Sequence, residues 1–236
     1  MKEKLYSIPV NDAFAVDCEC PICQMYKKLE DDAVDYTMGP SYMEDDTRAL
    51  TDKYGFCDKH LRMVYNKDNR LGMAWVMKTH FDKVINDVKG KLPSGNAKEL
   101  KKGIEAQAAI KKIDEYNCSC FVCNRVDGFF DNYLDTVFWL WRDDSEFRNK
   151  YNSCKGFCLP HYAALIKHGC KVLKGEQLEE FVKVTNELFV NNLERVRDDV
   201  AWFINKFDYK YQDEPWYNAK DSVIRSLVKE NGVILD

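Results

Sequence analysis

The sequence predicts an all-α protein made of two related helical halves, each closed by a Cys3His metal site. Apolar residues recur at helical spacing along almost the whole chain, which contains only 6 Pro and 11 Gly in 236 residues. A set of metal-ligand residues also occurs twice, about a hundred positions apart. Together these observations predict a duplicated helical domain with long, coiled-coil-like helices in its core.

The repeated motif reads C-x-C-x-x-C, then a long gap, then G-F-C-x-x-H. Its first copy consists of Cys18, Cys20, Cys23, Cys57 and His60. Its second copy consists of Cys118, Cys120, Cys123, Cys158 and His161. The offset is 100 residues for the first three members and 101 for the last two, so the second copy has one additional residue in its gap.

Composition limits the classes of function. The net charge of −4 and a pI of about 5.7 provide no strong positive field for phosphates, which disfavours a nucleic-acid partner. No apolar run approaches the roughly 20 residues of a membrane span, and residues 1–16 lack the apolar core of a signal peptide. We therefore expect a cytoplasmic protein, where ten reduced Cys suit metal ligation better than disulfides.

In the first half, residues 5–10 are the one candidate for an isolated extended segment. A helix is expected over residues 21–38, because Pro21 is tolerated in a first turn and Gly39-Pro40 ends the pattern. A polar stretch then leads to a helix that begins at Gly55-Phe56-Cys57. Another helix is expected over residues 70–88, with an apolar seam at Met77, Phe81, Val84 and Val88.

In the second half, the Pro, Ser and Gly of residues 91–96 indicate a linker, followed by a polar helix to about residue 116. An aromatic helix is expected over residues 121–141, and residues 143–155 match the earlier polar stretch. The longest helix, over residues 176–207, has a coiled-coil-like seam at Phe189, Leu193, Val196, Val200, Phe203 and Phe207. A short helix is expected after Pro215.

These elements divide the chain into a first helical zinc-binding half (1–92), a linker helix (93–116) and a second zinc-binding half with a C-terminal helical extension (117–236). Within each half we expect four ligands to meet. The first set is Cys20, Cys23, Cys57 and His60, and the second is Cys120, Cys123, Cys158 and His161. A C-x2-C turn and a C-x2-H turn, each supplying two donors to one ion, complete a tetrahedron.

All four ligand pairs are expected at helix starts, where free N–H groups and the helix dipole stabilise thiolates. Three thiolates and one imidazole favour zinc, so two zinc ions per chain are predicted, with iron or an iron–sulfur cluster as the less favoured alternatives. Cys18 and Cys118 are alternate ligands that could replace Cys20 or Cys120. Cys154 and Cys170 have no counterparts and are interpreted as packing residues.

No catalytic constellation is evident. Four protein ligands would leave no open position on the metal, and the chain has no H-E-x-x-H motif, Ser/His/Asp arrangement or Gly-rich phosphate loop. Thiol–disulfide chemistry at the C-x-C-x-x-C cysteines is a competing interpretation, because Cys20-Pro21-Ile22-Cys23 resembles a glutaredoxin-like active turn. That fold needs flanking strands, which the sequence does not predict. The sequence does not decide whether the protein is an enzyme, and it favours a non-enzymatic protein.

Four segments also resemble an uncharacterised bacterial family: Cys20-Pro21-Ile22-Cys23, Gly55-Phe56-Cys57, Gly156-Phe157-Cys158-Leu159-Pro160-His161 and Phe207-Asp208-Tyr209. This family is classed as a domain of unknown function in anaerobic Gram-positive bacteria, and some members are labelled ABC transporter substrate-binding proteins. The resemblance covers nearly the whole chain and implies a soluble protein with paired Cys/His sites. The transporter label does not fit a chain without a secretion signal or α/β alternation.

The predicted function is therefore that of a zinc-stabilised helical protein that binds an unknown protein or small-molecule partner. A metal-handling or thiol-redox protein is the alternative. A homodimer through the 189–207 seam is one expected mode of association, and no membrane partner is expected.

Overall fold

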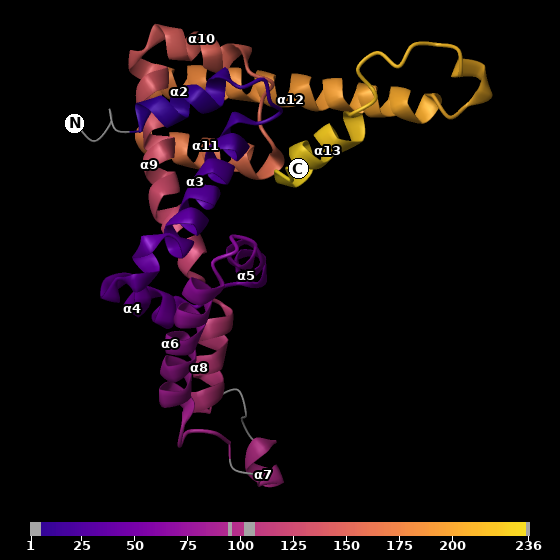
Figure 1. The fold of residues 1–236 in the computed structure, drawn as a ribbon. Coiled ribbons are helices and arrows are strands. Elements are labelled where there is room, and N and C mark those ends of the chain that lie inside the picture. Colours follow the sequence, from indigo (N-terminus) through magenta and orange to yellow (C-terminus); the bar gives the residue numbers. More distant parts are fainter. Residues whose placement is uncertain (1–5, 94–95, 102–106, 235–236) are drawn as a thin grey trace. The chain divides into compact units, whose positions relative to one another are not determined.

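The computed structural model describes residues 6–93, 96–101 and 107–234, and every regular element in these ranges is helical (Figure 1). The all-α prediction is thus confirmed. None of the described helices combines the length and the apolar character needed to cross a bilayer.

The chain forms two compact units that differ from the predicted halves. Unit 1 comprises residues 1–27 and 130–236, and unit 2 comprises residues 28–129. The division lies within helices α3 (Pro21–Met38) and α9 (Phe121–Asp143), far from the boundaries expected at residues 92 and 117. The start of the chain joins the C-terminal part because the first C-x2-C pair lies with ligands from that part, as described below.

Unit 1 contains α2 (Ser7–Ala15), α10 (Ser145–Ser153), α11 (Leu159–Val172), α12 (Gly175–Asn205), the short helix η3 (Tyr209–Tyr211) and α13 (Ser222–Asn231). Helix α12 packs against α11 and α13, and α2 packs against α10. The core is aromatic. The ring centroid of Phe181 lies 5.2 Å from that of Trp141 and 5.6 Å from that of Tyr151, and all three side chains are buried. Such ring pairs stabilise a core beyond their buried area alone.

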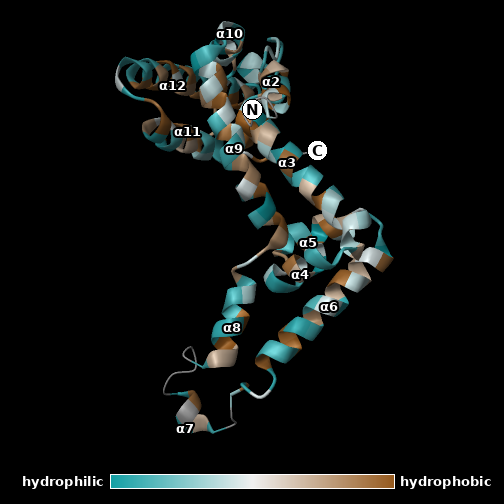
Figure 2. Cartoon of the chain, turned by 90° about the vertical axis from the view of Figure 1, so that its left-hand side faces the viewer, coloured by the Kyte–Doolittle hydropathy of each residue, from teal (hydrophilic) through white to brown (hydrophobic). Residues whose placement is uncertain are grey.

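Unit 2 contains η1 (Pro40–Met43), α4 (Asp45–Tyr54), α5 (Asp58–Tyr65), α6 (Arg70–Val88), α7 (Ala97–Leu100) and α8 (Ala108–Asn117). Helix α6 packs against both α4 and α8. The Tyr116 hydroxyl donates to Asp87 over 2.7 Å and ties α8 to α6. Figure 2 shows hydrophobic and hydrophilic bands along α6 and α8, but α6 buries only Gly72 and Val76, and Phe81 of its predicted apolar seam is exposed.

The helices predicted over residues 21–38 and 70–88 are confirmed at both ends. The two polar stretches, for which the sequence predicts no helix, fold as α4 and α10. Their first turns carry acidic residues, and the Asp144 carboxylate accepts from the backbone N–H groups of Glu146 and Phe147. Acidic caps and a few buried side chains such as Phe147 are sufficient for a short helix that packs on a neighbour.

The extended segment expected over residues 5–10 is wrong for its described part, because Ser7–Ala15 forms α2; Leu5 lies outside the described residues. Pro9 is the third residue of this helix. Its missing N–H has no partner within a first turn in any case, so proline does not prevent the helix there.

The longest helix is present as α12, but its predicted seam is only partly buried. Val196 is 3% exposed, whereas Phe207 lies beyond the end of the helix and is 74% exposed. The polar helix expected before the second motif appears as α7 and α8, and residues 102–106 between them lie outside the described range.

Candidate metal centres

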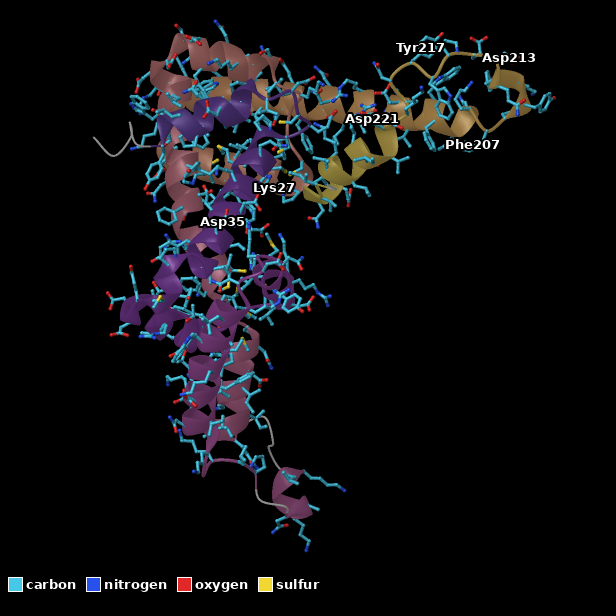
Figure 3. All side chains as sticks on the ribbon, in the orientation of Figure 1. Lys27, Asp35, Phe207, Asp213, Tyr217 and Asp221 are labelled. Atoms are coloured by element: carbon cyan, nitrogen blue, oxygen red, sulfur yellow. The ribbon has the colours of Figure 1, made fainter. Side chains whose placement is uncertain are left out.

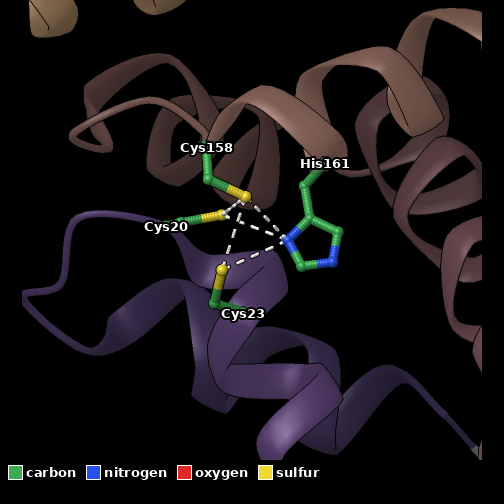
Figure 4. Close-up of side chains that lie close together, drawn as sticks. All are labelled: Cys20, Cys23, Cys158 and His161. Atoms are coloured by element: carbon green, nitrogen blue, oxygen red, sulfur yellow. Dashed lines mark hydrogen bonds between the residues drawn. The ribbon is translucent and has the colours of Figure 1, made fainter. Parts of the chain in front are cut away.

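The first cluster lies within unit 1 and joins the start of α3 to the start of α11. Its members are Cys20, Cys23, Cys158 and His161, whose donor atoms all lie within 4.8 Å of one another. The Cys158 sulfur lies 3.8 Å from that of Cys20 and 3.5 Å from that of Cys23. Figure 4 shows Nδ1 of His161 facing the three sulfurs, at 3.1 to 3.6 Å.

The second cluster lies within unit 2 and joins the start of α5 to the start of α9. Its members are Cys57, His60, Cys120 and Cys123. Nδ1 of His60 lies 3.2 Å from the Cys57 sulfur and 3.3 Å from each of the other two sulfurs. The Cys57 and Cys123 sulfurs are 4.0 Å apart. Each cluster therefore presents three thiols and one imidazole nitrogen around a single point.

The predicted grouping of these ligands within each sequence half is wrong. Cys20 and Cys23 lie with Cys158 and His161, and Cys120 and Cys123 lie with Cys57 and His60. The two C-x2-C pairs have exchanged partners. Local spacing sets only the two donors of each turn, whereas helix packing decides which two turns meet.

All four ligand pairs lie at helix starts, which confirms that part of the prediction. Cys57 and Cys158 are the N-cap residues of α5 and α11, with nearly identical backbone angles (φ −75°, ψ 165° and φ −76°, ψ 165°). Cys20 and Cys120 directly precede α3 and α9. The unpaired N–H groups of a first turn favour negative charge, so these positions suit thiolates.

The glycine before each C-x2-H turn has a backbone reason. Gly55 has φ +56° and Gly156 has φ +76°, a region that side chains disfavour. A Cβ at Gly156 would also lie 2.7 Å from the Leu188 carbonyl oxygen of α12. The backbone carbonyl of Gly55 accepts a hydrogen bond from the Phe121 N–H over 2.8 Å. This bond joins the two ligand turns of the second cluster.

A carboxylate lies behind the histidine of the second cluster. Nε2 of His60 is 2.9 Å from Oε1 of Glu30, and the same oxygen accepts from Lys59 over 2.6 Å. Glu30 and His60 are both buried. A carboxylate on Nε2 orients the ring and keeps Nδ1 directed at the thiols, an arrangement common behind metal-bound histidines.

Among the described residues, the histidine of the first cluster is surrounded by aromatic rings and not by a carboxylate. The rings of Tyr26 and Phe130 flank His161, with centroids 6.3 and 5.7 Å away. Gly232, which ends α13 at φ +68°, lies so close that a Cβ there would meet the Cys23 sulfur at 3.0 Å. One turn earlier, the buried Lys229 donates to the backbone carbonyl of Glu19 over 2.7 Å and also to that of Lys155.

The family model of DUF6062, described as a family of unknown function, matches residues 1–236. The chain belongs to this family. The resemblance to an uncharacterised family is thereby confirmed. No curated protein and no solved structure matches the chain significantly.

Proton affinities within the clusters reflect the crowding of thiols. In the DUF6062 chain, burial and the neighbouring Cys158 raise the pKa of Cys20, while hydrogen bonds from Cys20 and Cys23 lower the pKa of Cys158. Burial opposes ionisation of Cys120, but the hydrogen bond with His60 lowers its pKa to about 6. Burial also disfavours the His60 cation, but contacts with Cys120 and Glu30 raise the pKa of His60 to about 10.

The remaining cysteines of the DUF6062 chain belong to neither four-residue cluster. Cys18 and Cys154 are half-buried, and Cys118 and Cys170 are exposed. Burial raises the pKa of Cys18 to about 11, so its thiol stays protonated near neutral pH.

Sequence reasoning missed three residues around the clusters. Glu30 and Gly232 carried no signal, because neither has a motif or a recognisable spacing from its cluster. Glu19 was visible as an acidic residue between two cysteines, but its buried contacts with Arg195 and Lys229 were not.

Proposed function

We propose that the protein binds two zinc ions, one in each unit, as closed structural sites. Cys20, Cys23, Cys158 and His161 would hold the ion in unit 1, and Cys57, His60, Cys120 and Cys123 would hold the ion in unit 2. Each ion would clamp two helix starts that are far apart in the sequence. The donor geometry of the two clusters is the observation that carries this proposal.

The separations between donor atoms fit a tetrahedral zinc site. Zn–S bonds of about 2.3 Å and a Zn–N bond of about 2.0 Å give S···S edges of roughly 3.8 Å and S···N edges of roughly 3.5 Å. Three S···S separations are 3.5 to 4.0 Å, the S···N separations are 3.1 to 3.6 Å, and all donor atoms of a cluster lie within 4.8 Å of one another. The donors would therefore need to move by about an ångström or less.

The donor chemistry favours zinc and a structural role. Three thiolates with one imidazole are a common zinc donor set, and four protein donors leave no position open for a substrate water. A bound zinc with three thiolates has a formal charge of −1, which the helix starts at each pair would partly compensate. Metal binding of this kind stabilises the folded state directly, by on the order of 10 kcal/mol in small domains.

We place the protein among non-enzymatic, metal-stabilised modules that bind a partner or a small ligand. Each clamped helical unit would be rigid by itself, and the proposed metals would supply stability rather than reactivity. Free thiols at all ten cysteines are consistent with work in a reducing compartment such as the cytoplasm. The acidic net charge of −4 argues against nucleic acid as that partner.

The thiol-redox alternative is less well supported. Such chemistry needs a reactive thiolate, with Cys18 and Cys20 or Cys20 and Cys23 forming a reversible disulfide. Burial raises the pKa of Cys18 to about 11, which disfavours its thiolate. Cys20 and Cys23 both belong to the four-residue cluster of unit 1 and would be occupied by its ion.

Elemental analysis of purified protein tests the proposal. We expect about two zinc per chain and a large loss of thermal stability after the metal is removed with a strong chelator. Protein that contains no metal after expression in zinc-supplemented medium and binds none in titration would contradict it. So would a chelated sample with unchanged helicity and melting temperature.

A further inference from the structure

A polar pocket of about 370 Å³ opens in unit 1 beside the first metal cluster. Its lining comes from the segment before α3, the segment between α10 and α11, helix α12, the segment that leads into α13, and α13 itself. The lining residues are Glu19, Lys155, Arg195, Tyr217, Asn218, Lys220, Asp221 and Arg225. Figure 3 labels two of them, Tyr217 and Asp221, on the segment between α12 and α13. The volume falls within the range of small-molecule sites.

One buried polar atom in this pocket lacks a hydrogen bond. Glu19 is 7% exposed, and its Oε2 accepts from Arg195 over 2.5 Å and lies 3.2 Å from Nζ of Lys229. Its Oε1 accepts no hydrogen bond from the described part of the chain, and the Arg225 guanidinium lies 3.8 Å away. A buried acceptor without a donor is costly, so a ligand with an O–H or N–H group would find a strong site there.

The other lining groups favour an anion. Four basic side chains and two carboxylates line the pocket, and Lys155 is already paired over 2.5 Å with Asp17, which lies outside the lining. Arg225 is fully engaged, since its nitrogens contact Asp221, Asp199 and the Asn218 carbonyl. Lys220, in contrast, is exposed and has no partner among the described residues. Nη1 of Arg195 also has no partner in the described part of the chain, because Arg195 donates to Asn192 through Nε and to Glu19 through Nη2.

The pocket is built before any ligand arrives. Nζ of Lys206 donates to the carbonyls of Tyr211, Gln212 and Glu214 over 2.5 to 2.8 Å and fixes the loop after α12. The Trp202 indole donates to the Pro215 carbonyl over 3.0 Å, which fixes the approach to Tyr217. A binding site held in place by such contacts avoids the ordering cost of a mobile loop.

We propose that this pocket binds a small phosphate ester that also carries a hydroxyl group. The hydroxyl donates to Oε1 of Glu19, and the phosphate lies against Lys220 and Nη1 of Arg195. A phosphate monoester has a charge near −2 at neutral pH, which suits Lys220 and the unpaired Nη1 of Arg195. A singly charged hydroxy acid would satisfy Glu19 but would be attracted less strongly by these two cations.

Calorimetric titration of the metal-loaded chain tests this with three probes. Glycerol 3-phosphate carries both groups, propyl phosphate lacks the hydroxyls, and lactate replaces the phosphate with a carboxylate. We expect saturable binding of glycerol 3-phosphate, weaker by about tenfold for propyl phosphate, as for loss of a hydrogen bond to a charged group. Lactate is expected to bind more weakly than glycerol 3-phosphate.

Two variants locate the ligand. Lys220→Ala is expected to weaken glycerol 3-phosphate binding about threefold, as for a partly solvated ion pair, without changing stability. Lys183→Ala, on an exposed part of α12 away from the pocket, is the matched control and should leave Kd unchanged. Glu19→Gln should reduce the preference for glycerol 3-phosphate over propyl phosphate to about threefold or less.

The outcomes separate this proposal from the metal sites, because zinc content is measured on every variant and should stay at the parent value. Absence of saturable binding of glycerol 3-phosphate would overturn the proposal. It would also be overturned by equal binding of propyl phosphate, by tighter binding of lactate, or by equal effects of Lys220→Ala and Lys183→Ala. If Glu19→Gln does not fold, the comparison of Lys220→Ala with Lys183→Ala and the affinities of the three probes still test the proposal.

Discussion

His60 is held between a carboxylate and three thiols. Its Nε2 lies 2.9 Å from Oε1 of Glu30, while its Nδ1 lies 3.2 to 3.3 Å from the sulfurs of Cys57, Cys120 and Cys123. The carboxylate thereby sets which ring nitrogen carries the proton and which is available to an ion. Unit 1 surrounds its histidine with the rings of Tyr26 and Phe130 instead, so the two sites should respond differently to substitutions.

Replacing the carboxylate should weaken metal binding in unit 2. Glu30→Gln is expected to lower zinc affinity there about tenfold to a hundredfold, because loss of such an outer partner typically costs that much. The affinity is measured by chelator competition in a Cys158→Ser background, so that unit 2 supplies the metal signal. Glu44→Gln, at an exposed position in the same unit, is the control and should have no effect. Equal affinities for Glu30→Gln and its parent would exclude the role assigned to Glu30.

The end of α13 should protect the metal of unit 1. Gly232→Ala is expected to destabilise unit 1 by about 1 kcal/mol or more and to accelerate zinc loss from it. The new Cβ would combine unfavourable φ with a 3.0 Å approach to the Cys23 sulfur. Gly90→Ala is a matched control, because Gly90 has φ +79° but nothing within 4 Å. Transfer of zinc to a chromophoric chelator gives the rate, and identical release from both variants would contradict the prediction.

The buried Lys229 should be a large contributor to stability. Lys229→Met would remove one of the cations that contact the Glu19 carboxylate. It would also leave the backbone carbonyls of Glu19 and Lys155 without the hydrogen-bond donor that Lys229 supplies. We expect a loss of about 3 kcal/mol, typical of breaking one side of a buried ion pair. Lys183→Met, on exposed α12 surface, should change the free energy of unfolding by less than about 0.5 kcal/mol. Urea denaturation of zinc-loaded protein measures both, and similar values for the two variants would count against the prediction.

Zinc affinity in unit 2 should rise with pH. In the metal-free cluster the pKa of His60 is raised to about 10, so this ring is protonated at neutral pH and must lose its proton to bind metal. The pKa of Cys120 is lowered to about 6, so this thiol is already ionised above that pH. Displacing the His60 proton alone predicts a gain of about tenfold per pH unit between pH 7 and 9. Competition titrations at pH 7 and 8, corrected for the chelator, should reveal the slope; a pH-independent affinity would be inconsistent with it.

The local structure of the sites could be predicted from sequence, but their assembly could not. Spacing identified each C-x2-C and C-x2-H turn, and Pro21 with the two Gly-Phe pairs indicated helix starts. Within a turn, donor positions depend on neighbouring residues alone. Which turns meet depends on helix packing across more than a hundred residues, as between Cys23 and Cys158. Both groupings satisfy the same ligand spacing, so no local pattern distinguishes them.

The errors in the fold have a related origin. Helices α4 and α10 are short and polar. Acidic first turns and a few buried contacts stabilise both, and Asp144 also caps α10; hydrophobic periodicity detects none of these features. Glu30 and Lys229 lie on helices, and Gly232 directly follows one, but the sequence of these segments shows no connection to the clusters. The origin of the two halves by duplication stays a prediction from the repeated motif.

Zinc content of two double variants tests the exchanged ligand sets most directly. Cys23→Ser with Cys158→Ser removes two ligands from one cluster, so one zinc per chain should remain. Cys23→Ser with Cys57→Ser removes one ligand from each cluster, so both ions should be lost or strongly weakened. The reverse result, with one ion retained by the second variant and none by the first, would contradict the pairing of each C-x2-C turn with the C-x2-H turn of the other sequence half.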